Sequence, residues 1–395
     1  MTAMMGTTPA MTQRKLIIIT HEFAPFRGGV AIYAEELARA ILRTGAGVMV
    51  WAPDYGVRNA ECGTRSEERE DMGVRVVRLR AGGSLRFGDV FQFAGELSAR
   101  REQLIDSTVV LASVGAHLAW MLLEWAGLIG CDRVVSVLHG SEVLRFERNP
   151  FWRWLARIHF RRASGVVTVS AFSRSLIEKS FLGRMVGKVD LAPGACSSAA
   201  ARETAISRPE DGRVRIFTLA RIHPRKGQLE TARALGMLPA ELRAKIIYQV
   251  GGTGDANHLR QIVSACAEGG VPFEYLGAIA PDKLAEAYAG CDVFAMTSRS
   301  LARSVEGFGI AYLESGFHGK PVVAYRSGGT AEAVLDGESG FLVAEGDVKA
   351  LAEAFARLIC DPDLRARLGA GGRRHAAKFS WDSTARVVLD VCFGN

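Results

Sequence analysis

The chain has 395 residues, of which 48% are hydrophobic and 23% charged, and its formal net charge is +7. This length exceeds one ordinary domain and is sufficient for two, each with its own core. The composition excludes a fibrous or intrinsically disordered chain, and no apolar run approaches the roughly 20 residues that span a bilayer. The positive charge predicts an anionic partner, which could be a nucleotide diphosphate, an anionic membrane surface or nucleic acid.

The seven cysteines are odd in number, scattered, and never spaced as C-x-x-C. This pattern predicts a cytoplasmic protein with neither a disulfide framework nor a zinc site. Residues 1–14 are predicted to form a flexible tail. The apolar run Leu16–Ile19 is too short for the core of a signal peptide, so it predicts a first buried strand instead.

The first half of the chain alternates short apolar runs with helical patterns. A strand is predicted at Leu16–Thr20, followed by the glycine turn Gly28-Gly29 and a helix to about Arg43. We assign residues 15–198 to this first domain. Its further strands are predicted at Val48–Ala52, Val74–Leu79, Val109–Ala112, Val134–Leu138 and Val166–Val169.

A second series of strands makes up a second domain, which we assign to residues 213–380. Between the two series, residues 199–212 are rich in Ala, Ser, Arg and Glu and are the predicted linker. Strands separated by helices indicate an α/β fold with parallel sheets. Two doubly wound domains facing each other would form a cleft at the carboxyl ends of both sheets, where ligands bind in such folds. The strands of the second series are predicted at Arg213–Leu219, Lys245–Val250, Phe273–Leu276, Val293–Thr297, Val322–Tyr325 and Gly340–Val343.

Part of the positive charge lies in residues 145–162, where arginines alternate with aromatic side chains. Asn149-Pro150 is a typical helix start, with an Asn cap and Pro in the first turn. Such a helix could lie on an anionic membrane. Alternatively, it is an ordinary surface helix whose aromatic side chains pack into the core. Three of the arginines fall on one helical stripe: Arg153, Arg157 and Arg161.

Two carboxylates flank a glycine turn in the second half. Glu306 precedes Gly307-Phe308-Gly309, and Glu314 falls one turn into the helix that begins near Ile310. The turn exposes backbone N–H groups at the positive end of a helix, where a phosphate binds readily. Carboxylates on either side of it can accept hydrogen bonds from sugar or ribose hydroxyls. This arrangement predicts a nucleotide-sugar site.

Other strand ends in the second half carry polar or glycine-rich turns. Arg221 and Lys226 lie five residues apart on one loop and could hold the two phosphates of a diphosphate, although a solvated basic loop has the same appearance. Gly252 belongs to a second glycine turn, and Ser298 follows the strand before Glu306. Each signal is modest, and their order and spacing carry the prediction.

Taken together, these residues resemble the retaining GT-B glycosyltransferases, in particular the large fourth sequence family that uses nucleotide-diphosphate sugars. The resemblance covers nearly the whole chain. It implies an E-x7-E signature at Glu306 and Glu314 and a last helix that returns to the first domain. The other matching segments are Phe23–Val30, Arg221 with Lys226-Gly227, Gly319–Ala324 and Phe379-Ser380-Trp381.

The resemblance implies a role for each candidate residue. Arg221 and Lys226 would stabilise the departing diphosphate, Glu306 would hold the donor sugar beside the backbone of Phe308 and Gly309, and Glu314 would hold the ribose. His139, after a first-domain strand, would contact the donor sugar. The complete expected set is catalytic Arg221, Lys226, Glu306 and His139, with substrate-binding Gly28, Gly29, Gly252, Ser298, Gly307, Phe308, Gly309, Ile310 and Glu314.

The expected reaction is a same-face displacement in which the leaving phosphate helps to deprotonate the acceptor, so Glu306 positions the sugar and is not a nucleophile. The donor, linked to UDP or GDP, is a substrate, and we expect neither a cofactor nor an essential metal. Asp361-Pro362-Asp363 matches a D-x-D metal motif, but its setting predicts a helix start. The transferred sugar would be of the hexose type. The acceptor would be a glycan, a glycolipid or other lipid-linked molecule, or a small molecule, and the partners would not include nucleic acid.

Two departures from the family pattern concern the domain junction and the Arg221 loop. Pro193–Ser197 lacks the usual Asn and Asp, and Ala220 replaces a Gly. Two other functions stay open at this point. One is a nucleotide-sugar epimerase or hydrolase of the same fold, and the other is a basic membrane- or nucleic-acid-binding protein with a vestigial cleft. The location would be cytoplasmic, with peripheral attachment to a membrane through residues 145–162 as the alternative.

Overall fold

The structure is a computed structural model and describes residues 15–55, 68–71, 73–204, 211–302 and 304–394. It divides into two compact units. Unit 1 holds the described residues up to Val169, Arg174–Ala192 and those from Trp381 onward, and unit 2 holds Ser170–Ser173 and Pro193–Ser380. Residues 193–198, which we expected to close the first domain, therefore cluster with unit 2. The predicted tail, residues 1–14, lies outside the described residues.

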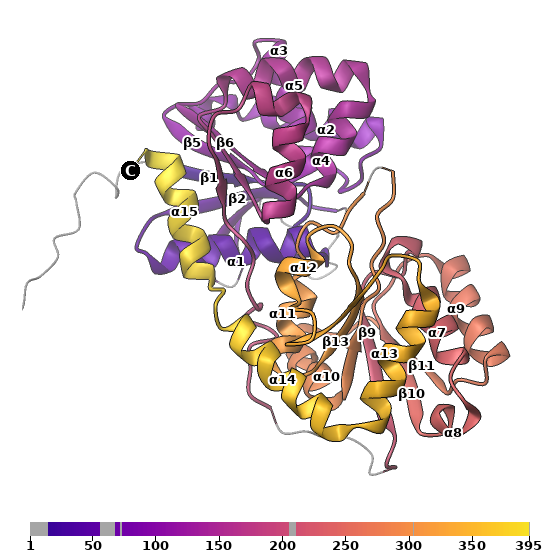
Figure 1. Cartoon of the computed structure of the whole chain (residues 1–395). Helices are drawn as coiled ribbons and strands as arrows, with labels where there is room; N and C mark the ends of the chain where they lie inside the picture. Colours follow the sequence, from indigo (N-terminus) through magenta and orange to yellow (C-terminus); the bar gives the residue numbers. More distant parts are fainter. Residues whose placement is uncertain (1–14, 56–67, 72, 205–210, 303, 395) are drawn as a thin grey trace, which may run out of the picture. The chain divides into compact units, whose positions relative to one another are not determined.

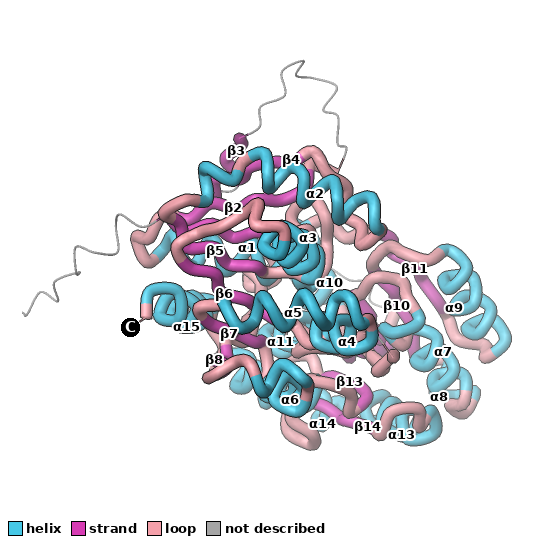
Figure 2. The backbone as a smooth tube through the Cα atoms, turned by 90° about the horizontal axis from the view of Figure 1, so that it is seen from above, coloured by secondary structure: helices cyan, strands magenta, loops and turns pink. Residues whose placement is uncertain are grey.

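Unit 1 is built on an eight-stranded sheet in the order β3-β4-β2-β1-β5-β6-β7-β8, which can be followed in Figure 2. All neighbouring strands are parallel except β3 and β4. The strands are β1 Lys15–Ile19, β2 Val48–Pro53, β3 Glu68–Asp71, β4 Val74–Leu79, β5 Ser107–Leu111, β6 Arg133–Leu138, β7 Gly165–Thr168 and β8 Val189–Leu191. The helices are α1 Gly29–Arg43, α2 Phe87–Ala99, η1 Arg101–Leu104, α3 Val114–Trp125, α4 Ser141–Arg148, α5 Pro150–Arg162, α6 Ala171–Lys179, η2 Phe181–Arg184 and α15 Trp381–Phe393.

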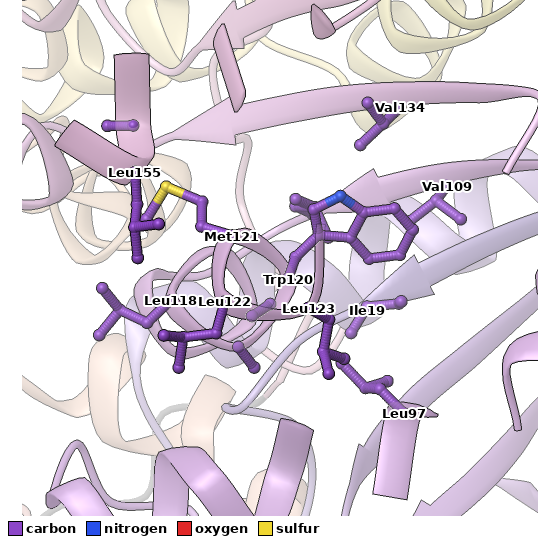
Figure 3. Packing of buried hydrophobic residues seen from close by; sticks show 14 of the residues in the cluster. Ile19, Leu97, Val109, Leu118, Trp120, Met121, Leu122, Leu123, Val134 and Leu155 are labelled. Atoms are coloured by element: carbon purple, nitrogen blue, oxygen red, sulfur yellow. The ribbon is translucent and has the colours of Figure 1, made fainter. Parts of the chain in front are cut away.

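The helices of unit 1 cover both faces of its sheet. The strands between them are therefore buried on both sides, which explains why they carry apolar residues at nearly every position. In β1, Ile17 and Ile19 join a buried cluster with α2, α3, α4, α5 and α6. Figure 3 shows part of this cluster, with Trp120 of α3 lying near Val109 and Val134 of the sheet. The opposite face is covered by α1 and α15.

Unit 2 contains a six-stranded, all-parallel sheet in the order β11-β10-β9-β12-β13-β14. Figure 1 labels four of its strands, β9, β10, β11 and β13. Its main buried cluster joins the strands to α7, α9 and α13. The strands are β9 Val214–Leu219, β10 Ile246–Gly251, β11 Phe273–Gly277, β12 Val293–Ala295, β13 Val322–Tyr325 and β14 Gly340–Val343. The helices are η3 Pro224–Lys226, α7 Gln228–Gly236, α8 Ala240–Arg243, α9 Ala256–Glu268, η4 Pro281–Lys283, α10 Leu284–Gly290, α11 Ile310–Phe317, α12 Thr330–Ala333, α13 Val348–Cys360 and α14 Pro362–Ala376.

The last helix, α15, returns to unit 1 and packs on α1 and on the strands β6, β7 and β8. Trp381 at its start is buried, and its ring meets Tyr33 of α1 edge to face with centroids 5.5 Å apart. The Tyr33 hydroxyl donates to the carbonyl oxygen of Ala192 at 2.8 Å. The expected return of the final helix to the first domain is therefore confirmed.

The doubly wound α/β fold predicted from the sequence is confirmed in both units, with every predicted strand present to within one or two residues. Two short strands were not predicted, β3 and β8. The charged sequence of β3 gives no strand signal, and β8 has only three residues. Among the described residues, no helix is long and apolar enough to cross a membrane, and no disulfide joins any two of the six described cysteines.

Candidate active site

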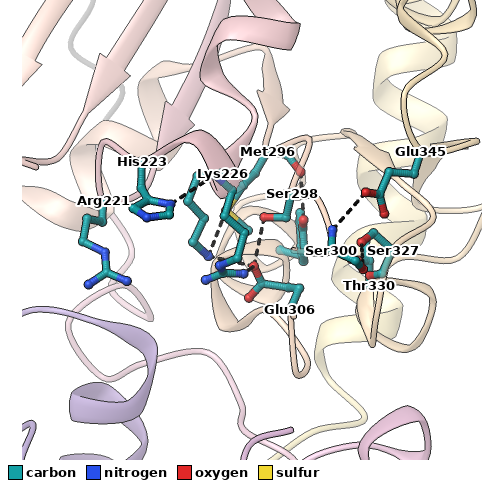
Figure 4. A network of polar contacts seen from close by, with 12 residues as sticks. Arg221, His223, Lys226, Met296, Ser298, Ser300, Glu306, Ser327, Thr330 and Glu345 are labelled. Atoms are coloured by element: carbon teal, nitrogen blue, oxygen red, sulfur yellow. Dashed lines mark hydrogen bonds and ion pairs between the residues drawn. The ribbon is translucent and has the colours of Figure 1, made fainter. Parts of the chain in front are cut away.

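Glu306 is held by three donors that all reach the same carboxylate oxygen. Its Oε2 accepts from Lys226 Nζ at 2.7 Å, Arg225 Nη1 at 2.9 Å and Ser298 Oγ at 2.9 Å (Figure 4). Among the described residues, no hydrogen bond reaches Oε1. The carboxylate is therefore fixed through one oxygen, and the other is available to accept from a ligand.

The charges around Glu306 shift its titration and that of Lys226. Burial raises the pKa of Glu306, but the attraction of Lys226 and Arg225 outweighs it and brings the pKa to about 2. Burial lowers the pKa of Lys226 to about 8, although Glu306 acts in the opposite direction. At neutral pH, Glu306 is ionised and Lys226 is mostly protonated.

Close backbone packing fixes these side chains. Gly227, after Lys226, has φ 74°, and an added Cβ would lie 2.0 Å from the carbonyl oxygen of Thr297. Gly328 has φ 59°, and its Cβ would lie 2.2 Å from the carbonyl oxygen of Glu306. The Gly329 N–H donates to that same oxygen at 2.8 Å. Only glycine fits these approaches, so the loops carrying Lys226 and Glu306 are both held rigidly.

The turn after Glu306 presents its backbone at the start of α11. Gly309 caps the helix with φ 97°, and Ile310 is its first residue. The Phe308 side chain is buried and meets Phe379 edge to face at 5.3 Å. Gly307 accepts a hydrogen bond from Ser170 Oγ at 2.5 Å through its carbonyl oxygen. These residues therefore offer backbone groups to a ligand, while their side chains stabilise the turn.

Arg221 lies apart from this network. Its side chain is exposed, and Figure 4 shows it extending away from Lys226 and Glu306. The adjoining loop is close-packed, because Gly252 has φ 118° and an added Cβ would meet the Ala220 carbonyl oxygen at 2.1 Å. The cation that instead contacts Glu306 is Arg225, which the sequence analysis did not single out.

Glu314 is almost completely buried, with 2% of its surface exposed. Its Oε1 accepts from Ser197 Oγ at 2.5 Å, and its Oε2 accepts from the Tyr288 hydroxyl at 2.7 Å. Both carboxylate oxygens of Glu314 therefore accept a hydrogen bond from the protein itself. Tyr288 gave no signal in the sequence, and Ser197 was noted only as a departure from the family pattern.

Three predicted residues belong to unit 1. His139 follows β6, its Nε2 lies 3.1 Å from the carbonyl oxygen of Ala112, and its ring meets Tyr33 edge to face at 5.1 Å. Gly28 and Gly29 open α1, and an added Cβ at Gly29 would meet no atom within 4 Å. Within the described parts of the chain, the packing thus leaves the space beside Gly29 open.

The predicted helix within residues 145–162 is confirmed as α5, because Asn149 accepts from the backbone N–H groups of Phe151 and Trp152. Some of its aromatic side chains pack into the core, as in an ordinary surface helix, and others are exposed, as in a membrane-binding helix. Phe160 is buried, whereas Phe151 and Trp154 are 45% and 43% exposed.

Asp361 caps α14 by accepting from the Leu364 N–H at 2.8 Å, and Pro362 lies in the first turn. The predicted helix start at the D-x-D sequence is therefore confirmed.

Two Rossmann-like parallel sheets with a C-terminal helix that returns to α1 define the GT-B fold of glycosyltransferases. Solved structures agree. A sucrose-phosphate synthase from Thermosynechococcus elongatus superposes with a TM-score of 0.79 at 19% identity, covering 96% of this chain and 98% of that one. Anabaena Alr3699/HepE, in complex with UDP and glucose, gives 0.73 at 19% identity and covers 96% and 99%.

The sequence comparisons identify the family. The model "Glycosyltransferase Family 4" matches residues 27–184, and "Glycosyl transferases group 1" matches residues 201–375. The GDP-mannose-dependent alpha-(1-6)-phosphatidylinositol monomannoside mannosyltransferase of Mycobacterium tuberculosis is 31% identical over 96% of this chain and 98% of its own length. The protein of the same name from Mycolicibacterium smegmatis is 33% identical, covering 94% and 96%. The chain belongs to the family 4 glycosyltransferases and is a retaining hexosyltransferase.

Proposed function

We propose that this enzyme transfers a mannosyl residue from GDP-mannose to a phosphatidylinositol mannoside, with retention of the anomeric configuration. The donor and the acceptor are those for which two mannosyltransferases that match nearly the whole chain are named. The observation that carries the transferase chemistry is the Glu306 network, since it presents a fixed carboxylate and two cations in one place.

The chemistry follows from the charges of that network. Glu306 Oε1 accepts from hydroxyls of the donor sugar and holds its anomeric carbon in place. The bond from that carbon to the diphosphate oxygen breaks, and the acceptor oxygen bonds to the carbon on the same face. The acceptor's proton passes to the leaving phosphate. Lys226 of the network, together with Arg221 from the same loop but outside the network, stabilises the negative charge that grows on the diphosphate, which is electrostatic preorganisation.

Other residues would bind the rest of the donor. Glu314 accepts from the ribose hydroxyls by sharing the oxygens that Ser197 and Tyr288 already reach. The turn before α11 offers N–H groups to a phosphate, which helix N-termini favour. In unit 1, the open space beside Gly29 supports a close approach of the donor or acceptor to the backbone. His139 would contact the donor sugar.

A donor and acceptor matrix tests the proposal. Purified enzyme would be offered GDP-mannose or UDP-glucose, each with a phosphatidylinositol monomannoside or with buffer alone, and the product's anomeric configuration would be determined by NMR. We expect α-mannosylated lipid only from GDP-mannose with the lipid. Turnover of the donor without an acceptor, or transfer from UDP-glucose alone, would contradict the proposal.

A further inference from the structure

Unit 1 carries a basic pocket of about 640 Å³ that the proposed chemistry does not use. It lies where α5, the end of α6 and η2 come together, and Figure 1 shows α5 and α6 on the same side of the unit. Seven charged side chains line it, five cationic and two anionic: Arg153, Arg157, Arg161, Lys179, Arg184, Glu147 and Glu178.

The cations are held together without carboxylate partners. None of the five forms an ion pair within 4.0 Å with another of the described residues. Two of them instead share an aromatic ring, because the guanidinium carbons of Arg153 and Arg157 lie 5.1 Å and 5.9 Å from the centroid of Phe181. This ring fixes both guanidinium groups beside the hollow. Like charges repel, so an anion that enters the pocket would relieve an unfavourable arrangement.

The two carboxylates of the pocket limit which anion fits. Glu147 and Glu178 would repel a bare phosphate but can accept hydrogen bonds from hydroxyl groups. The guanidinium forks match a phosphate. A ligand that carries one phosphate and several hydroxyls uses both kinds of group.

An exposed aromatic surface adjoins the pocket on the same helix. Phe151 and Trp154 of α5 are about half exposed, and Trp125 at the end of α3 is 53% exposed. The rings of Trp125 and Trp154 meet edge to face with centroids 5.6 Å apart. Exposed aromatic side chains beside arginines are typical of surfaces that enter the lipid headgroup region.

We infer that this pocket binds the phosphate and hydroxyls of an anionic phospholipid headgroup, with Phe151, Trp154 and Trp125 in the lipid interface. The choice of a lipid as the source of the phosphate rests on the proposed function, in which the acceptor is itself a membrane lipid. The pocket then anchors the enzyme to the surface that contains its acceptor, and it is separate from the donor-binding residues of unit 2.

Vesicle binding by the full chain tests the inference without any donor. The variant carries R153E, R157E and R161E, and the matched control carries R367E, R374E and K378E, which change the same charge on exposed positions of α14 and its end. Flotation would use phosphatidylcholine vesicles with phosphatidylinositol or, at equal charge, phosphatidylserine. A second variant with Gln at the same three positions serves if the first does not fold, and near-UV circular dichroism of the tryptophans reports folding of unit 1.

We expect the pocket variant to bind phosphatidylinositol vesicles at least about 100-fold more weakly, since each basic residue near an anionic surface contributes roughly fivefold. The control should lose far less, and the wild type should prefer phosphatidylinositol over phosphatidylserine. If the pocket variant and the control lost vesicle binding equally, the binding would depend on the overall positive charge and not on the pocket, and the inference would be overturned. Glycerophosphoinositol binding as tightly as the vesicles would overturn the lipid source in favour of a soluble phosphate ester.

These outcomes are distinguishable from failure of the proposed function. Vesicle binding requires neither GDP-mannose nor transfer, so a wrong donor leaves the pocket result unchanged. Conversely, the pocket variant should retain thermal stabilisation by GDP, because none of its three substitutions lies in unit 2. Trp154→Phe gives an independent readout: part of the tryptophan fluorescence shift on vesicle binding should disappear, while charge-dependent binding persists.

Discussion

Replacing Glu306 with Gln should change the pH dependence of the enzyme through Lys226. The pKa of Lys226 is lowered by burial to about 8, and Glu306 is the attraction that keeps it from falling further. The Lys226 ammonium lies 2.7 Å from the carboxylate. An opposite charge at such a distance moves a pKa by about 1–3 units, so in E306Q the pKa of Lys226 should lie between about 5 and 7.

The magnitude follows from the protonated fraction. At pH 7.5, a group with a pKa of about 8 is about three-quarters protonated, and lowering the pKa by about 1–3 units reduces that fraction about threefold to 200-fold. Loss of the sugar contact adds to this, since removing one preorganised electrostatic contact costs about 100-fold to 1000-fold in rate. We expect kcat/KM of the wild type to decline above pH 8 and that of E306Q to decline from a lower pH.

The assay is kcat/KM for GDP-mannose between pH 5 and 10, because this ratio reports the free enzyme's ionisations. E306Q combined with Lys226→Arg is the matched control. A guanidinium does not titrate in this range, so the decline of kcat/KM at high pH, which we call the basic limb of the profile, should vanish. S298A, which removes an uncharged donor from Glu306, should leave the limb near pH 8. A basic limb in E306Q at the wild-type pH or higher would refute the reasoning.

Three further predictions concern single contacts. G227A should lower the melting temperature and abolish stabilisation by GDP, because its Cβ would lie 2.0 Å from a carbonyl oxygen, whereas G290A, with open space around it, should be neutral in the same scan. Y288F should weaken GDP about tenfold, because it removes the hydroxyl that holds the Glu314 carboxylate in position for the ribose and a hydrogen bond to a charged group contributes roughly 1.5–3 kcal/mol. By calorimetry it should weaken 2′,3′-dideoxy-GDP much less. W381A should destabilise unit 1 by about 3–5 kcal/mol in urea, with faster hydrogen exchange in α15, and an unchanged midpoint would contradict its role in docking that helix.

The fold could be predicted because its signals are local and repeated. Most β-strands buried on both faces are short apolar runs, and several strand-to-helix turns carry glycine or a capping residue, as at Gly28 and Asp255. Such signals depend only on neighbouring residues. The antiparallel strand β3 was not predicted, because its sequence, ERED, is charged throughout. It is a strand through its backbone pairing with β4, which its own residues do not indicate.

The candidate site was only partly predictable, because its key contacts join residues far apart in the chain. The motif positions of Lys226 and Glu306 were visible, but nothing in the sequence indicates that the two side chains meet across 80 positions. Tyr288 lies in a helix with no unusual pattern, and its hydroxyl reaches Glu314 only after α10 and α11 have packed on the sheet. Distance in sequence removes the spacing signal on which motif analysis depends.

The placement of Arg225 explains how one carboxylate can serve both the fold and the sugar. If Lys226 alone held Glu306, movement of the lysine toward a diphosphate would release the carboxylate during the reaction. Arg225 and Ser298 hold the same oxygen independently, each at 2.9 Å. Lys226 can therefore turn toward the leaving group while Glu306 stays in position. On this argument R225Q should lower kcat more than it weakens GDP, since it loosens the sugar's support and leaves the phosphate contacts intact.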